Sequence, residues 1–117
     1  MGKGDHLGEF EQLILLALAT VGDEASGRQV HEEIARATGR DVAVTAVYVT
    51  LNRLIKKGHI SAGMGTSPPP GGGRVKKLFR LEAAGAAALR QLRDRFDLMW
   101  KGAESHPQLR ALGGRQQ

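Results

Sequence analysis

The chain has 117 residues and a mass of 12.6 kDa, which is the size of one domain. Its composition, 41% hydrophobic and 25% charged, is that of a globular protein, and the lack of cysteine excludes a disulfide framework, a thiolate metal site and a cysteine nucleophile. A net charge of +5 favours an anionic partner. The longest apolar run, residues 13–19, is far shorter than the ~20 residues of a membrane helix, so we expect a cytoplasmic protein without a signal peptide.

The positive charge is concentrated in the middle of the sequence. Residues 1–35 carry a net charge of −5, residues 36–80 carry +8, and residues 81–117 carry +2. One strongly basic segment is typical of a surface that binds a polyanion such as a nucleic acid. On charge alone, a solvated basic face without a partner remains the alternative.

Three helical segments are predicted in the first half of the chain. Residues 7–21 form the first, and its apolar side chains lie on more than one side, so it needs two burial surfaces. One would be its own domain, and the other could be a second subunit. Residues 26–38 form the second, with Ser26 as its N-cap. Residues 44–57 form the third, with apolar side chains spaced i, i+4, i+7 and i+8.

Two strands and a long helix follow. Residues 59–66 and 75–81 alternate apolar and polar side chains, and a run of prolines and glycines joins them, which predicts a hairpin. Residues 82–106 are predicted as one helix of roughly 36 Å, longer than a small domain needs to cover itself. We therefore expect this helix to project and to pair with a second subunit. Pro107 ends it, and we expect residues 107–117 to be a flexible tail.

Three helices followed by a hairpin are the arrangement of a winged helix-turn-helix. We therefore predict a mainly α (α+β) fold, with a DNA-binding domain at residues 1–81 and a C-terminal dimerisation helix at residues 82–106. The third helix can lie in the major groove, which is about 12 Å wide, while the hairpin reaches a neighbouring backbone or minor groove. The outward face of the third helix and the basic base of the hairpin supply the candidate DNA contacts: Thr45, Ala46, Tyr48, Val49, Asn52, Arg53, Lys56, Arg74 and Lys76.

Each kind of candidate has a structural alternative. The charges of Arg53 and Lys56 could simply be solvated, as could those of the hairpin. Val49 could touch a thymine methyl group or be an ordinary exposed valine. Tyr48 could donate its hydroxyl to a phosphate or serve only in packing. Lys57 flanks the same face of the third helix.

A second set of candidates is apolar and belongs to the first and last helices. These side chains would bury each other across a twofold axis between two subunits: Leu15, Leu16, Leu89, Leu92, Phe96, Met99 and Trp100. Phe96, Met99 and Trp100 could also hold a flat aromatic effector between the subunits. The alternative is plain dimer packing, because apolar stripes at helical spacing are more often core.

Catalytic and metal sites are not indicated. The four histidines have no ligand spacing: His6, His31, His59 and His106. Residues 71–74 lack the Gly-Lys-Ser/Thr ending of a phosphate loop, and no Ser/His/Asp arrangement is visible. We therefore expect neither an enzyme nor a bound cofactor.

Three motifs carry a resemblance to a known family. They read Val47-Tyr48-x-x-Leu51-x-Arg53-Leu54-x-x-x-Gly58, then Gly72-Gly73-Arg74 with Lys76-Lys77, then Phe79-Arg80-Leu81-x-x-x-Gly85. Over residues 7–103 the chain resembles the short, one-domain kind of PadR family regulator, a family of bacterial transcription factors. Ala43 stands where the family usually has Ser or Thr to cap the third helix.

The resemblance implies a homodimeric transcription factor, usually a repressor of an adjacent gene, that binds a palindromic operator in double-stranded DNA. It implies that the fourth helices of two subunits pair, and that a small aromatic or lipophilic effector bound near this interface can release the operator. The competing functions are a winged-helix protein-interaction module and a small-molecule carrier without DNA binding. Salt-sensitive retention on a DNA column would separate them.

Overall fold

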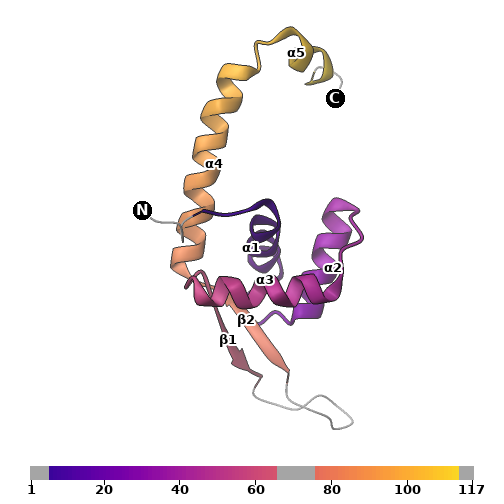
Figure 1. The fold of residues 1–117 in the computed structure, drawn as a ribbon, viewed down its shortest axis with the longest axis vertical. Helices are drawn as coiled ribbons and strands as arrows, with labels where there is room; N and C mark the ends of the chain where they lie inside the picture. Colours follow the sequence, from indigo (N-terminus) through magenta and orange to yellow (C-terminus); the bar gives the residue numbers. More distant parts are fainter. Residues whose placement is uncertain (1–5, 66–75, 114–117) are drawn as a thin grey trace.

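The computed structural model describes residues 6–65 and 76–113, and it contains five helices and a two-stranded antiparallel sheet (Figure 1). In chain order the elements are α1 (Glu9–Val21), α2 (Gly27–Thr38), α3 (Val44–Lys56), β1 (Ile60–Met64), β2 (Lys77–Leu81), α4 (Ala83–Ala103) and α5 (Pro107–Gly113). The first three helices form one body, with the hairpin extending at one end and α4 at the other. The molecule measures 59 × 35 × 21 Å. The predicted winged-helix fold is confirmed.

Local signals in the sequence define the helix ends. The Ser26 hydroxyl accepts the N–H of Gln29 at the start of α2, and the Gln29 side chain accepts the N–H of Ser26 in return. Gly39 follows α2 with a φ of 72°, a left-handed conformation that glycine adopts without strain. α1 begins two residues later than predicted, because Gly8 is its N-cap and donates its N–H to the Glu11 carboxylate.

One hydrophobic core lies between α1, α2 and α3, and the hairpin completes it. Phe79 extends from β2 into this core and is only 1% exposed. The N–H of Phe79 donates to the Ala25 carbonyl at 2.7 Å, which attaches β2 to the segment before α2. Burying each large side chain contributes roughly 1.5–3 kcal/mol. The core consists of Leu7, Ile14, Leu15, Ala17, Leu18, Ala25, Val30, Ile34, Val47, Leu51, Leu54, Ile60 and Phe79.

The burial of α1 corrects one sequence prediction. Leu15 is 0% exposed, so its assignment to a dimer interface is wrong. Part of the second burial surface that α1 needs comes from its own chain, since α2, α3, β2 and α4 all pack against this helix. Leu16 is 51% exposed and remains available to a second subunit.

The hairpin becomes more exposed with distance from the body. Ile60 of β1 pairs with Leu81 of β2 beside the core, and Met64 pairs with Lys77 at the outer end. Ile60 is buried, whereas Met64 is 63% exposed. The outer end of the hairpin therefore contributes little to the core and is free to contact another molecule. Its tip, including Arg74, lies outside the described residues.

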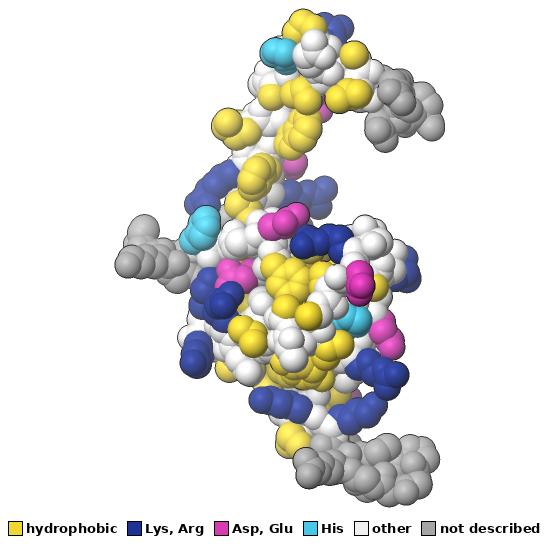
Figure 2. Space-filling model, turned by 45° about the vertical axis from the view of Figure 1, so that its right-hand side comes forward, with side chains coloured by type: hydrophobic (Ala, Val, Ile, Leu, Met, Phe, Trp, Pro, Cys, Tyr) yellow, Lys and Arg dark blue, Asp and Glu magenta, His cyan; other side chains and the backbone are white. Residues whose placement is uncertain are grey.

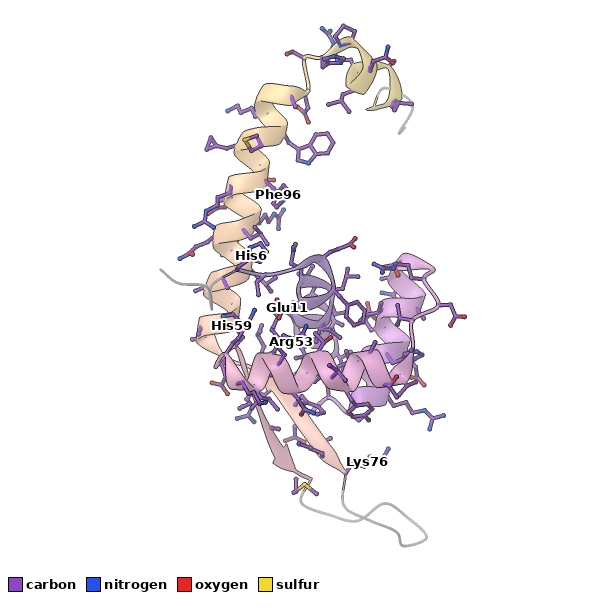
Figure 3. The ribbon with its side chains drawn as sticks, viewed as in Figure 1. His6, Glu11, Arg53, His59, Lys76 and Phe96 are labelled. Atoms are coloured by element: carbon purple, nitrogen blue, oxygen red, sulfur yellow. The ribbon has the colours of Figure 1, made fainter. Side chains whose placement is uncertain are left out.

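The first half of α4 is attached to the body. The N–H of Glu82, the N-cap of α4, donates to the His59 carbonyl at 3.0 Å, and Gly85 packs against the same carbonyl oxygen. The half-buried side chains of α4 that pack on the core are Ala88, Leu89 and Leu92. From Phe96 onward α4 extends away from the body, as Figure 3 shows.

The segment after α4 differs from the prediction of a flexible tail. Residues 107–113 form the short helix α5, which turns back at the end of α4 (Figure 1). Pro107 is its first residue, where a fixed φ and a missing N–H are favourable, rather than only the end of the preceding helix. The N–H of Gln108 donates to Nδ1 of His106 at 3.1 Å, which caps the new helix.

Candidate nucleic-acid interface

The outward face of α3 is exposed along its whole length. Its buried side chains, Val47, Thr50, Leu51 and Leu54, face the core. The side chains predicted to contact DNA lie on the other sides of the helix and are all exposed: Thr45, Ala46, Tyr48, Val49, Asn52, Arg53 and Lys56. Val49 is 56% exposed and adds an apolar contact surface between polar neighbours. The helix therefore presents hydroxyl, amide, apolar and basic groups together on one surface.

Tyr48 is packed on one side and exposed on the other. One side of its ring lies against Gly27 at the start of α2, and the ring meets Phe79 edge to face, with centroids 6.5 Å apart. The residue is nevertheless 41% exposed. Its packing fixes the position of the hydroxyl, which suits a directional hydrogen bond to a partner outside the chain.

The hairpin adds basic groups beside α3. Lys76 is exposed just before β2, and Figure 3 shows it at the end of the hairpin farthest from α4. Lys77 is exposed too, and its ammonium group lies 5.8 Å from the centre of the Phe79 ring. Among the described residues, Arg53, Lys56 and Lys76 form no ion pair with a carboxylate. Their charges are therefore available to an anion from outside.

Lys57 does not belong to this surface, contrary to the sequence interpretation. Its ammonium group donates to both carboxylate oxygens of Glu11 at 3.0 Å and to the His6 carbonyl at 2.9 Å. Burial raises the pKa of the Glu11 carboxyl, but hydrogen bonds from Gly8 and Lys57, with the charges of Lys57 and Arg53, outweigh it. The net result is a pKa below the ordinary value of 4.5. Glu11 is thus an ionised anchor for the end of α3, and sequence reasoning missed it.

A second exposed surface follows α4. Phe96 is 53% exposed, Met99 is 72% exposed and Trp100 is 51% exposed, and all three lie on the side of α4 that continues from Leu89 and Leu92. Figure 2 shows hydrophobic side chains following one another along α4 toward α5. Beside the base of this stripe is a groove of about 540 Å³ between α1 and α4. Its apolar lining includes Leu16, Ala19, Leu81, Leu89, Leu92 and Phe96.

Within the residues that the structure describes, no group of three or more His, Asp or Glu side chains could hold a metal ion. His31 has a structural role, because its Nε2 is 2.8 Å from the Val42 carbonyl oxygen between α2 and α3. His59 is 4% exposed at the start of the hairpin.

Among the helices of residues 6–65 and 76–113, none has the length and apolar character needed to span a membrane.

Comparisons with known proteins agree on the fold. No family model and no curated protein matches the chain. A PadR family transcription regulator from Clostridium difficile R20291 superposes with a TM-score of 0.69 at 18% identity, over 84% of this chain and 97% of that one. A PadR family regulator from Eggerthella lenta gives 0.64 at 20% identity, over 83% and 84%.

A third similar structure is BpsR of Bordetella bronchiseptica, whose DNA binding is regulated by 6-hydroxynicotinic acid. It superposes with a TM-score of 0.62 at 18% identity, over 96% of this chain and 76% of that one. At these identities the three likenesses show a shared fold, the winged helix of transcription regulators.

Proposed function

We propose that the protein is a PadR-type transcription regulator that binds specific sequences in double-stranded DNA as a homodimer. Its simplest role is that of a repressor in the cytoplasm of a bacterium. The observation that carries this proposal is the row of exposed polar and basic side chains on α3, with an exposed lysine on the adjacent hairpin. The resemblance of the motifs and the fold of the PadR family structures support it. The apolar stripe on α4 supports the dimer.

The contacts divide by chemistry. Arg53 and Asn52 are suited to base edges in the major groove, since a guanidinium pairs with guanine and an amide with adenine. Val49 is suited to a thymine methyl group. Lys76 and the hydroxyl of Tyr48 are suited to phosphates, which set the register of the protein without reading sequence.

The homodimer follows from the second surface. A twofold axis that brings the exposed half of α4 against the α1–α4 groove of another copy would cover Leu16, Phe96 and Met99 together. Two α3 helices related by such an axis would read a palindromic operator, because the DNA must match the symmetry of the protein.

The test uses a duplex selected from a random library and a scrambled duplex of equal length. We expect tighter binding to the selected duplex and an affinity that falls steeply with salt. The Lys76→Ala variant should lower the slope of log Kobs against log salt by about 0.9 for each subunit, because one phosphate contact is lost. Lys101→Ala, an exposed lysine on distal α4, is the matched control and should leave the slope unchanged. Binding that is absent or insensitive to salt would favour the protein-interaction module or the carrier.

A small aromatic effector is a second element of the proposal. Trp100 and Phe96 are exposed on one side of α4, where a twofold axis would bring two copies together, and flat aromatic rings can stack between them. BpsR, a structural neighbour, responds to an aromatic acid. We expect some members of a panel of planar aromatic acids and lipophilic aromatic cations to quench Trp100 saturably and to release the selected duplex. Trp100→Ala should bind DNA and lose the release. If no compound quenches Trp100 in a folded dimer, the apolar stripe on α4 serves only to pack the two subunits together.

A further inference from the structure

Two adjacent lysines at the end of α3 have opposite surroundings. Lys56 is exposed on the outward face and forms no ion pair among the described residues. Lys57 is turned toward α1, where its side chain is 19% exposed and its ammonium group has three oxygen partners. The sequence makes them look equivalent, but the structure gives only one of them to the solvent.

The partner of Lys57 is itself held in place. The Glu11 side chain is 8% exposed, and it accepts the Gly8 N–H as well as the Lys57 ammonium group. Glu11 belongs to the first turn of α1, and His6 to the segment before that helix. Figure 3 shows His6 and Glu11 near the end of α3 that precedes His59. The contacts therefore join the N-terminal end of α1 to the C-terminal end of α3.

We propose that Lys57 is a positioning residue. It links the C-terminal end of α3 to Glu11 and His6, and so sets the angle at which α3 enters the major groove of DNA. This inference rests on the proposed DNA-binding function. A mostly buried ion pair adds little net stability, because desolvating two charges offsets their attraction, but it favours one geometry over others. Here that geometry relates the DNA-facing side chains of α3 to α1, whose Leu16 lies at the proposed dimer surface.

The two lysines should therefore affect DNA binding in different ways. Lys56 contributes to affinity for any duplex by neutralising a phosphate, and its effect depends on salt. Lys57 contributes only where the exact placement of α3 matters, which is at base edges in the selected duplex. Removal of its charge therefore changes selectivity and leaves the salt dependence as it was.

The experiment compares Lys56→Met and Lys57→Met, since methionine keeps the apolar stem and removes the charge. Binding to the selected and scrambled duplexes is measured at several salt concentrations, at a temperature where circular dichroism shows every variant fully folded. Lys56→Met should weaken both duplexes and lower the salt slope by about 0.9 for each subunit. Lys57→Met should weaken the selected duplex by about tenfold, the effect of one lost base contact, and leave the scrambled duplex and both slopes unchanged.

Lys57→Met leaves the Glu11 charge without a cationic partner, and this variant could fail to fold, so a second variant is needed. In Glu11→Gln/Lys57→Met both charges are removed, so the protein should fold and show the same loss of selectivity. A lower salt slope for either Lys57 variant, or unchanged selectivity in the folded double variant, would overturn the proposal. If the wild-type protein binds neither duplex, the proposed function fails instead. In that case hydrogen exchange still tests the contact between Lys57 and Glu11. Faster exchange of the amides at the end of α3 in the double variant would show that the contact holds this end in place, and unchanged exchange would show that it does not.

Discussion

The ring of Tyr48 lies directly against the α-carbon of Gly27, so that a Cβ at position 27 would overlap the ring. This contact joins the first turn of α2 to the middle of α3, the two helices of the helix-turn-helix. The close approach of the Tyr48 ring, and not the backbone conformation, is what favours glycine here. The same contact fixes the position of the Tyr48 side chain, which is 41% exposed beside the candidate DNA face.

We expect Gly27→Ala to destabilise the protein by roughly 1–3 kcal/mol, because the added methyl group forces the Tyr48 ring or α2 to shift. Urea denaturation measures this effect. In a Tyr48→Ala background the space is open, so the same substitution should cost much less. Equal costs in the two backgrounds would contradict the contact.

Tyr48→Phe separates packing from hydrogen bonding. The phenylalanine ring keeps the contacts with Gly27 and Phe79, so the unfolding free energy should change little. Affinity for all duplexes should fall by roughly tenfold or more if the hydroxyl donates to a phosphate, since a hydrogen bond to a charged group contributes about 1.5–3 kcal/mol net of competition with water. Fluorescence anisotropy with labelled DNA checks this, and an unchanged affinity would leave Tyr48 with packing alone.

The junction between the hairpin and α4 should be equally sensitive at Gly85. Alanine is favoured over glycine in a helix by about 1 kcal/mol, but a Cβ at position 85 would overlap the His59 carbonyl oxygen, which is backbone and cannot turn aside. The overlap should dominate and give a net loss of roughly 1–2 kcal/mol. Gly102, in the same helix, has open space around it, so Gly102→Ala should stabilise the protein. Thermal melts of both variants provide the comparison.

The exposed half of α4 offers a matched pair for the dimer. Phe96 lies on the apolar stripe, whereas Leu98 is 69% exposed on the other side of the helix. Phe96→Glu should place an unpaired charge in the interface and give a monomer in sedimentation velocity, with weakened operator binding. Leu98→Glu should remain a dimer. If both variants remain dimeric, α4 does not form the interface.

The Glu11–Lys57 pair predicts how stability depends on pH. Because folding lowers the pKa of Glu11 below 4.5, the folded protein holds its charged form more strongly than the unfolded chain does. This stabilisation is complete above 4.5 and is lost as the pH falls through the lower, folded value. Urea midpoints measured at decreasing pH should therefore fall less steeply in Glu11→Gln than in the wild type.

A surface pair provides the control for that experiment. The hydrogen bond from Arg36 lowers the pKa of Glu33, and because the Arg36 side chain is 70% exposed, this effect should fade as salt is added. The contribution of the mostly buried Glu11 should persist at high salt. A pH dependence that disappears entirely with salt would assign it to surface pairs instead.

Much of the fold was predictable because its signals are local. Ser26 and Gly39 mark the ends of α2, and the apolar spacing identified α3 and its buried side correctly. The helix α5 was missed because seven residues carry too little periodicity, and Pro107 was interpreted as an end rather than as a beginning. The roles of the exposed α3 side chains in DNA binding remain predictions.

The errors at the candidate sites concern contacts distant in sequence. Nothing near Lys57 indicates that its partner, Glu11, is 46 positions away, so the sequence pattern predicts only that Lys57 flanks the outward face of α3. Leu15 was misplaced for a similar reason, since helical spacing shows which side chains share a face but not how many elements cover it. The spacing of apolar residues shows which side chains share one face of a helix, whereas only the tertiary structure shows which element packs against that face.

The separation of α4 into an attached half and a free half has a consequence for the evolution of related chains. Residues 85–92 are constrained by the body, whereas in the proposed dimer residues 96–103 would be constrained only by the second copy. If the proposed dimer and DNA contacts hold, exchanging this distal segment among paralogues would change which chains assemble and would leave the operator preference with α3. The choice of partner subunit and the choice of DNA sequence could then diverge independently. New hetero-oligomeric regulators could arise from a few substitutions in two helical turns.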